Sequence, residues 1–396
     1  MIDKIRIQNF KSVVDTTIEL GRVNIIIGEN GCGKTNVLEA ISFASAASQD
    51  KLDFLGNFLR VTKPEFMFSA FENENNSEKI FNISVTEHNK IDSVYKIFYD
   101  TENNKWRNGQ EFLEDLKIPT LLKTVIGTKG NKEIIKRLDD FSDFEKLETW
   151  IDSSSFDKIR SNIPNTFKQL NKQIINKPYL DSFLIYTPEE TMLRRFSDET
   201  QLLPLGRRGE GLFQYLKELA TKEDNLTIMK DITDGLMLLD WFEGLEIPKD
   251  LLSNEYRLDV KDRYLNESLL YFDQRSTNEG FLYLLFYLTL FSSKQTPAFF
   301  AIDNIETSFN PKLCTKLVRY LIELAKKNNK QVIITTHSPF VLDGLDLSDK
   351  DQRLFVARRN IDGHTKLNRI PYKEDRNMIL SELWMSGLIG GLPDNF

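Results

Sequence analysis

The feature that most constrains the fold is the segment at residues 28–35, Gly-Glu-Asn-Gly-Cys-Gly-Lys-Thr, which fits the pattern G-x-x-x-x-G-K-[ST]. It follows an apolar run at residues 23–27 and precedes residues 36–47, where Ala, Leu, Ile and Val recur at helical spacing. When this pattern lies between a strand and a helix, the glycine-rich loop typically binds nucleotide phosphates. The sequence therefore predicts an α/β fold in which the strand at 23–27 is buried on both faces.

Each residue type in this loop has a chemical role. Glycines let backbone N–H groups curl around phosphate oxygens, and the following helix adds the positive end of its dipole. Lys34 reaches the β- and γ-phosphates, and the Thr35 hydroxyl ligates Mg²⁺, so ATP and Mg²⁺ are the predicted cofactors. We interpret Cys32 as an incidental small residue rather than a redox switch. The predicted nucleotide-binding residues of the loop are Asn30, Gly31, Cys32, Gly33, Lys34, Thr35 and Asn36.

A second apolar strand, at residues 297–303, ends in the carboxylate of Asp303. Such a strand places its carboxylate where it holds the Mg²⁺ ion and its waters, so Asp303 and Thr35 are the predicted metal ligands. Asn304 follows, and an amide orients water without accepting its proton. The nearest carboxylate beyond is Glu306, which serves in catalysis only if its loop delivers it to the γ-phosphate. The alternative for Glu306 is a salt-bridging or loop-stabilising residue.

A third strand, at residues 331–336, is followed by His337. Open α/β sheets bind ligands at the carboxyl ends of their strands, so we expect His337 to sense the γ-phosphate. The residues that we expect to take part in catalysis are Lys34, Asp303, Asn304, Glu306 and His337.

The rest of the chain divides into regions of different pattern. Residues 79–87 and 94–99 alternate like antiparallel strands and predict a small β subdomain. Residues 111–180 lose the strand signals and read as a helical insertion. In the last third, a helix from Gly280, a strand at 298–303, a helix at 311–327 and strands at 331–336 and 353–357 imply a parallel sheet with helical crossovers.

Composition excludes several classes of protein. Against 52 Lys and Arg there are 59 Asp and Glu, a net charge of −7, so the surface as a whole does not attract nucleic acid, although a local basic groove remains open. Two cysteines and three histidines exclude a disulfide framework and leave little for a zinc hydrolase. No apolar run reaches the roughly 18 residues of a membrane span, and the first residues do not form a signal peptide. We expect a cytoplasmic protein without a membrane partner.

In order and spacing these motifs resemble the ABC-type ATPases of the RecF, OLD and SMC branch. The resemblance rests on residues 5–12, 28–36, 303–311 and 336–339, and it spans most of the chain apart from the insertion. It implies a P-loop ATPase head with a mixed sheet, a small antiparallel β subdomain and a helical insertion instead of a long coiled coil, because no sustained heptad run is present. The expected domains are residues 1–110 and 181–396, the two parts of the head, and 111–180, the insertion.

The resemblance also implies a head-to-head dimer, in which ATP lies between the phosphate loop of one subunit and a signature segment of the other. The candidate signature here is residues 276–280, with Ser276, Asn278 and Gly280 as its expected nucleotide contacts. It departs from the usual Leu-Ser-Gly-Gly pattern. In this branch a Glu normally follows the strand-ending Asp, so Asn304 implies slow hydrolysis.

Two further segments allow alternative interpretations. Residues 205–212 look signature-like but lie too far upstream of Asp303. A tight turn that opens a helix is the favoured interpretation, and phosphate binding by Arg207 or Arg208 is the alternative. Residues 383–393 are apolar enough to need a surface, which is either their own domain or a partner.

The leading functional hypothesis is an ATP-dependent dimerising switch, the sensor or regulatory subunit of a bacterial antiphage complex. OLD-like enzymes carry a Toprim nuclease after the ATPase, and the chain after His337 is too short for one, so we expect a separate effector subunit, such as an HNH or Toprim-like nuclease. The alternatives are a RecF-like DNA-repair ATPase that binds duplex DNA and an ATP-gated scaffold that binds without hydrolysis. A transporter subunit is disfavoured, because no glutamine of a Q-loop can be assigned.

Overall fold

The computed structural model describes residues 1–49, 51–52, 63–71, 79–88, 93–109, 179–195, 204–248, 258–266, 272–273, 276–374 and 378–392. The expected insertion at 111–180 lies almost wholly outside these residues. Its helical character and its boundaries therefore stay predictions.

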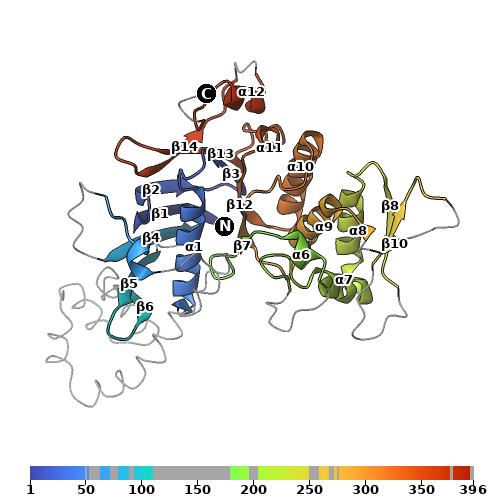
Figure 1. Cartoon of the computed structure of the whole chain (residues 1–396), viewed down its shortest axis with the longest axis horizontal. Coiled ribbons are helices and arrows are strands. Elements are labelled where there is room, and N and C mark those ends of the chain that lie inside the picture. Colours follow the sequence, from blue (N-terminus) through green and yellow to red (C-terminus); the bar gives the residue numbers. More distant parts are fainter. Residues whose placement is uncertain are drawn as a thin grey trace, which may run out of the picture.

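A six-stranded sheet forms the centre of the molecule (Figure 1). Five strands run parallel and the edge strand β14 is antiparallel to its neighbour, so the sheet is mixed. All six residues of β3 are buried, as expected for a strand covered on both faces. In spatial order the strands are β14 (Thr365–Ile370), β13 (Gln352–Arg359), β3 (Val23–Gly28), β12 (Gln331–Thr335), β11 (Phe299–Ile302) and β7 (Ile185–Tyr186).

Helix α1 and a second sheet cover one face of the central sheet. Helix α1 (Lys34–Ser48) packs against both sheets, and most of its residues are buried, which explains why it is apolar on nearly every side. Phe10, Phe43 and Phe81 join β1, α1 and β4 through edge-to-face ring contacts. The antiparallel sheet runs β2 (Val13–Glu19), β1 (Ile2–Phe10), β4 (Ile80–Glu87), β5 (Ser93–Asp100) and β6 (Lys105–Gly109).

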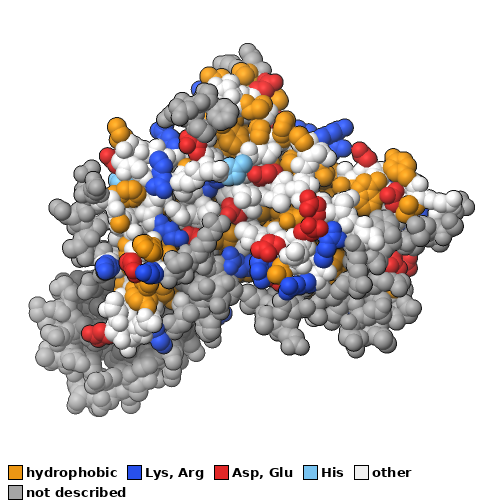
Figure 2. Space-filling model, viewed as in Figure 1, with side chains coloured by type: hydrophobic (Ala, Val, Ile, Leu, Met, Phe, Trp, Pro, Cys, Tyr) orange, Lys and Arg blue, Asp and Glu red, His pale blue; other side chains and the backbone are white. Residues whose placement is uncertain are grey.

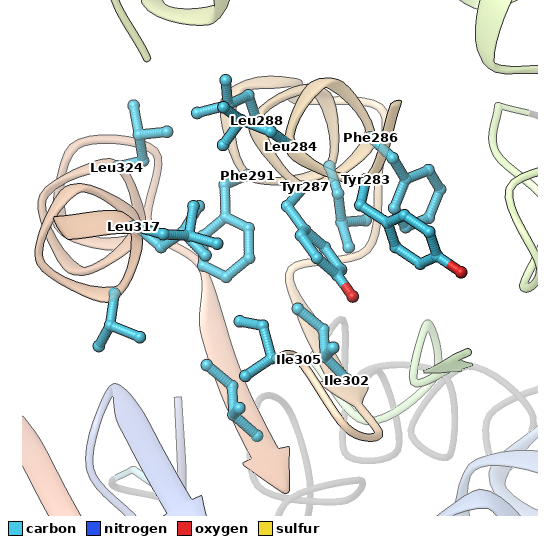
Figure 3. Packing of buried hydrophobic residues seen from close by; sticks show 14 of the residues in the cluster. Tyr283, Leu284, Phe286, Tyr287, Leu288, Phe291, Ile302, Ile305, Leu317 and Leu324 are labelled. Atoms are coloured by element: carbon cyan, nitrogen blue, oxygen red, sulfur yellow. The ribbon is translucent and has the colours of Figure 1, made fainter. Parts of the chain in front are cut away.

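Helices cover the opposite face, and the almost wholly buried α9 lies at their centre. In Figure 3, Tyr287 and Phe291 of α9 point toward Ile302, Ile305 and Leu317. Because the loop after β11 starts from this packing, its position is fixed by the core. Besides α1, the α-helices of the described chain are α9 (Glu279–Ser292), α10 (Pro311–Lys327), α7 (Leu212–Thr221), α8 (Leu226–Leu236), α6 (Glu190–Leu193), α11 (Pro339–Leu342) and α12 (Leu380–Met385). A small antiparallel sheet, β8 (Phe242–Glu246), β9 (Asp259–Asp262) and β10 (Phe272–Asp273), completes this region.

The strand expected at residues 353–357 is present, but another strand that was not predicted follows it. β13 is longer, and β14 follows it as the second arm of a hairpin. β14 reads Thr-Lys-Leu-Asn-Arg-Ile and lies at the sheet edge, so most of its side chains are polar and at least partly exposed. Its pattern is therefore too weak to distinguish from a loop. The strands β2 and β6 were missed in the same way.

No helix in the described part of the chain is long and apolar enough to cross a membrane. Near the C-terminus, Leu380, Leu383 and Trp384 of α12 are buried in the same hydrophobic core as α9 and α10. Docking of the apolar segment at 383–393 on its own domain is therefore confirmed for Leu383 and Trp384. Met385 and Leu388 of the same segment are exposed.

Candidate nucleotide-binding site

The predicted site residues follow three neighbouring parallel strands. Lys34 lies after β3, Asp303 directly after β11, and His337 shortly after β12. Because parallel strands end at one edge of a sheet, the pairing of β3 with β12 and of β12 with β11 brings all three loops to the carboxyl edge.

The backbone of the loop at residues 28–33 requires glycine. Gly31 and Gly33 have φ of 76° and 103°, a region that other residues seldom adopt. A Cβ on Gly28 would lie 2.3 Å from the carbonyl oxygen of Ala357, so this position also has no room for a side chain. A Cβ on Gly31 would meet nothing within 4 Å, which places this residue at the open side of the loop. The loop is thus tightly packed at Gly28 and open at Gly31, as expected of a loop whose backbone approaches a ligand closely.

Lys34 is only 6% exposed, and its ammonium group is bound by the loop itself. Nζ donates to the carbonyl oxygens of Gly28 (2.8 Å) and Glu29 (2.9 Å). Burial lowers the pKa of Lys34, while the nearby Asp303 and Glu306 raise it. Phosphate oxygens carry more negative charge than carbonyl oxygens, so they are able to replace these two acceptors.

The two predicted magnesium ligands, Thr35 and Asp303, lie next to each other. The Thr35 hydroxyl lies 3.3 Å from Oδ2 of Asp303, and the other carboxylate oxygen of Asp303 accepts a hydrogen bond from Thr335. A hydroxyl and a carboxylate are the donors that Mg²⁺ takes when phosphates and water complete its shell. Within the described ranges, no group of three or more His, Cys, Asp and Glu residues could hold a metal.

The loop after β11 brings Glu306 to His337. One carboxylate oxygen of Glu306 accepts from the Thr336 hydroxyl (2.7 Å) and the other from the His337 backbone N–H (2.8 Å). The negative charge of Glu306 raises the pKa of both Lys34 and His337, against the other effects on each group. Glu306 therefore stabilises the loop, as the alternative interpretation predicted, and its role in catalysis stays a prediction.

His337 is exposed at the rim of this cluster. Partial burial and the charge of Lys34 lower its pKa below the ordinary value of 6.5, against the opposing effect of Glu306 and Asp303. The imidazole is therefore neutral at pH 7 and offers both a hydrogen-bond donor and an acceptor.

Asn304 adopts a backbone conformation that explains its identity. Its φ is 57°, in the left-handed region that asparagine tolerates better than most side chains. The backbone N–H donates to the Thr335 hydroxyl (3.0 Å), and the residue is exposed. The turn that starts at Asn304 is what carries Glu306 inward.

The candidate signature segment at 276–280 begins α9. Ser276 and Asn278 are exposed, and the Asn278 amide oxygen caps the helix by accepting from the Phe281 N–H (2.9 Å). A Cβ on Gly280 would lie 3.1 Å from the Ser308 carbonyl, so the segment contacts the loop that follows Asp303. Its role as a nucleotide contact stays a prediction.

The segment at 205–212 is a turn that opens α7, as predicted. Gly211, with φ of 77°, precedes the helix, and Gly209 has φ of 102°. Arg207 donates to the carbonyl of Ile185 (3.0 Å), and Arg208 pairs with Glu210. Arg207 thus holds the turn against β7, whereas the pair of Arg208 with Glu210 lies within the turn.

Three residues beside the loop escaped the sequence analysis. Arg359, Thr365 and Thr335 bind loop or metal-site atoms, but they come from strands in which Thr and Arg are ordinary residues. No local signal marks them, because their role depends on which strands the fold makes neighbours.

Comparisons with known proteins identify the family and the fold of the chain. The family described as "AAA domain, putative AbiEii toxin, Type IV TA system" matches residues 23–343. The chain is 22% identical over 373 residues to a Helicobacter pylori protein named ATP/GTP phosphatase, covering 89% of this chain and 90% of that protein. Over 44 residues it is 48% identical to the DNA double-strand break repair Rad50 ATPase of Sulfolobus acidocaldarius, which is 11% of this chain and 5% of Rad50.

Among solved structures, an SMC head bound to the C-terminal winged-helix domain of ScpA is similar in fold. The TM-score is 0.56 at 13% identity, over 95% of this chain and 99% of that one. The chain belongs to the AAA-domain family named above, and its fold is that of an ABC-type ATPase head of the SMC and RecF-like branch. The predictions of the fold class and of an ATPase of this branch are confirmed.

Proposed function

We propose that this chain binds Mg-ATP at the carboxyl edge of its central sheet, hydrolyses it slowly and uses the cycle as a dimerising switch. The observation that carries the proposal is the connected arrangement of Lys34, Thr35, Asp303, Glu306 and His337 at one edge. A P-loop ATPase needs a cation for the phosphates, oxygen ligands for the metal and a group that orients water.

Nucleotide binding would begin with an exchange of partners at Lys34. Its ammonium would leave the carbonyls of Gly28 and Glu29 for phosphate oxygens, while the N–H groups of the loop and of the first turn of α1 bind the remaining oxygens. Thr35 and Asp303 would hold Mg²⁺, which neutralises phosphate charge when bound.

Glu306 is the proposed water-orienting group. Its carboxylate is already held by Thr336 and His337, so an attacking water would use a remaining lone pair rather than a free carboxylate. A restrained base and the absence of a carboxylate at Asn304 both support slow turnover. Phosphate release by the purified protein tests this, since turnover at the rate of an ordinary ATPase, about 10 s⁻¹, would contradict it.

Dimerisation is proposed for the ATP-bound state. Ser276 and Asn278 are exposed at the start of α9, and the proposal places the nucleotide of a second copy against them. Mass measurement in solution with Mg-ATP is the test, using Glu306→Gln to slow hydrolysis and Lys34→Met as the matched control that lacks the phosphate contact. Conversion of Glu306→Gln to a dimer only with Mg-ATP supports the proposal. A nucleotide-independent mass in every variant contradicts it.

The biological role that we favour is a regulatory ATPase subunit of an antiphage complex with a separate nuclease-like effector. The support is the AbiEii description of the matching family. Phage plating on cells that carry the native locus, with the wild-type chain or Lys34→Met, tests the role. Purification of the native complex identifies the effector. Equal plating efficiency with both chains would overturn the defence role.

DNA repair is the second candidate, because of the Rad50 match over 44 residues. On the face in Figure 2, small groups of Lys and Arg lie among Asp and Glu side chains rather than in a continuous basic stripe over its described part. A gel shift with duplex DNA at fixed salt, with and without Mg-ATP, separates the two candidates. ATP binding without any phosphate release would instead favour the scaffold.

A further inference from the structure

The hairpin of β13 and β14 lies against the outer side of the phosphate loop. From β13, Nε of Arg359 donates to the carbonyl of Gly31 (3.1 Å). From β14, the hydroxyl of Thr365 donates to the carbonyl of Cys32 (2.7 Å). Two consecutive carbonyl groups of the loop are thus held by side chains on the two arms of one hairpin.

Thr365 is the last member of a buried chain of hydrogen bonds. The Asn36 amide donates to the Ser12 hydroxyl (2.6 Å), and the hydroxyls of Ser12 and Thr365 lie 2.7 Å apart. Thr365 is 0% exposed and Ser12 is 5% exposed. An amide NH₂ only donates and a carbonyl only accepts, so Ser12 must donate to Thr365, and Thr365 to Cys32. Every hydroxyl in the chain accepts one bond and donates one.

This arrangement fixes the orientation of one N–H group of the loop. In a trans peptide the C=O and the following N–H point in opposite directions. Because Thr365 draws the Cys32 carbonyl toward the hairpin, the N–H of Gly33 is turned the other way, toward the open side of the loop. The contact is close: a Cβ on Gly33 would lie 2.1 Å from the Thr365 hydroxyl oxygen.

We propose that Thr365 is a positioning residue for nucleotide binding: by holding the Cys32 carbonyl it presets the phosphate loop so that the Gly33 N–H faces the phosphates. The inference rests on the proposed function and adds a residue far from the loop in sequence. A preset loop does not have to be reoriented when the nucleotide binds, so the effect falls on affinity. Thr365 does not reach the reacting atoms, and the chemical step is unaffected.

The test compares variants of the full chain by calorimetric titration with Mg-ATP and with Mg-ADP. Thr365→Val removes the hydroxyl at nearly constant volume and should raise both dissociation constants about tenfold, leaving kcat at saturating ATP within about threefold of wild type. Thr365→Ser should restore affinity. Thr16→Val is the matched control, because the buried Thr16 hydroxyl donates to the Thr365 carbonyl (2.9 Å) without touching the loop. It should lower Tm while keeping wild-type affinity.

Ser12→Ala provides a second route if Thr365→Val does not fold. It removes the donor to Thr365 and should raise the dissociation constants about threefold. Wild-type nucleotide affinity in a folded Thr365→Val variant would overturn the proposal. If that variant does not fold, wild-type affinity in Ser12→Ala would overturn it. A loss of affinity in Thr16→Val as large as that in Thr365→Val would also overturn it, because the effect would then be only structural. A wild-type chain that binds neither nucleotide would instead refute the proposed function.

Discussion

Two buried lysines lie at opposite edges of the central sheet, and their surroundings differ. Lys34, after β3, is held by two loop carbonyls and lies near the carboxylates of Asp303 and Glu306. Lys330, directly before β12, is 2% exposed and donates to three oxygens, the carbonyl and hydroxyl of Thr296 and the carbonyl of Pro297. The acceptors of Lys34 belong to an open loop, whereas those of Lys330 are enclosed.

The comparison separates a binding group from a structural one. At the amino edge, the neighbouring Asn24 and Gln331 are also fully bound to backbone groups of β1, β12 and the turn before β3. Burial lowers the pKa of Lys330 to about 7, and carboxylates do not figure among the causes of that shift. At the carboxyl edge, Lys34 lies near the carboxylates of Asp303 and Glu306, at the site proposed for the nucleotide. Burial alone thus does not identify a functional lysine; exchangeable partners do.

The largest expected effect is that of Lys34→Met. Removal of the only side chain that is proposed to bind the phosphates from within the loop should lower kcat/KM for ATP at least about 1,000-fold. The thermal midpoint should change by only a few degrees, because the two carbonyls it leaves can bind water. Phosphate release and a melting curve measure the two effects. Lys330→Met is the control, and it should retain kcat/KM within about twofold.

Glu306→Gln should have the next largest effect. Loss of the carboxylate should lower kcat about 100-fold while Mg-ATP still binds, since general-base groups contribute about 10² to 10⁴. Asn304→Gly keeps the positive φ and removes the amide, and it should change kcat by less than about fivefold. Single-turnover hydrolysis measures both. A larger loss in Asn304→Gly than in Glu306→Gln would reassign the water-orienting role.

Lys330→Met should act on stability instead of turnover. It leaves the enclosed oxygens of Thr296 and Pro297 without their donor, so we expect the free energy of unfolding to fall by about 1–3 kcal/mol. Denaturant titration gives this value. If Lys330→Met kept its stability but hydrolysed ATP poorly, Lys330 would be a functional residue and not a structural one.

The smallest expected effect concerns pH: the difference in free energy of unfolding between the wild type and Lys330→Met should depend on it. Lys330 has a pKa of about 7 in the folded chain, and about 10.4 is typical of an unfolded one. Between these two pKa values the unfolded chain binds more protons at this lysine than the folded chain does. The contribution of Lys330 to stability therefore rises with pH, and it is lost as the pH falls from about 10.4 through about 7. Relative to Lys330→Met, the wild type should gain about 1 kcal/mol from pH 7 to pH 8. A flat difference would mean that Lys330 stays charged.

The sequence was most informative where function depends on a short local string. The phosphate loop, Asp303 and His337 could be located because each follows an apolar run that becomes a buried strand. Because those strands are parallel neighbours, the three segments that follow them lie at the same edge of the sheet. The edge strands β2, β6 and β14 were missed, because partial exposure weakens the apolar pattern on which strand prediction depends.

Other parts of the site could not be predicted from local pattern. The position of Glu306 depends on the left-handed turn at Asn304, which is a property of backbone conformation and not of spacing. The contact of Thr365 with Cys32 joins residues more than 300 positions apart and exists only because β13 pairs with β3. Such contacts follow from sheet order, which the sequence alone did not determine.

The most direct test of the account is a crystal structure with Mg²⁺ and a nonhydrolysable ATP analogue. The account predicts that Nζ of Lys34 leaves the carbonyls of Gly28 and Glu29 for phosphate oxygens, and that Thr35 and Asp303 lie on the metal. An analogue bound elsewhere, or a Lys34 that keeps its carbonyl partners while the nucleotide is present, would contradict it.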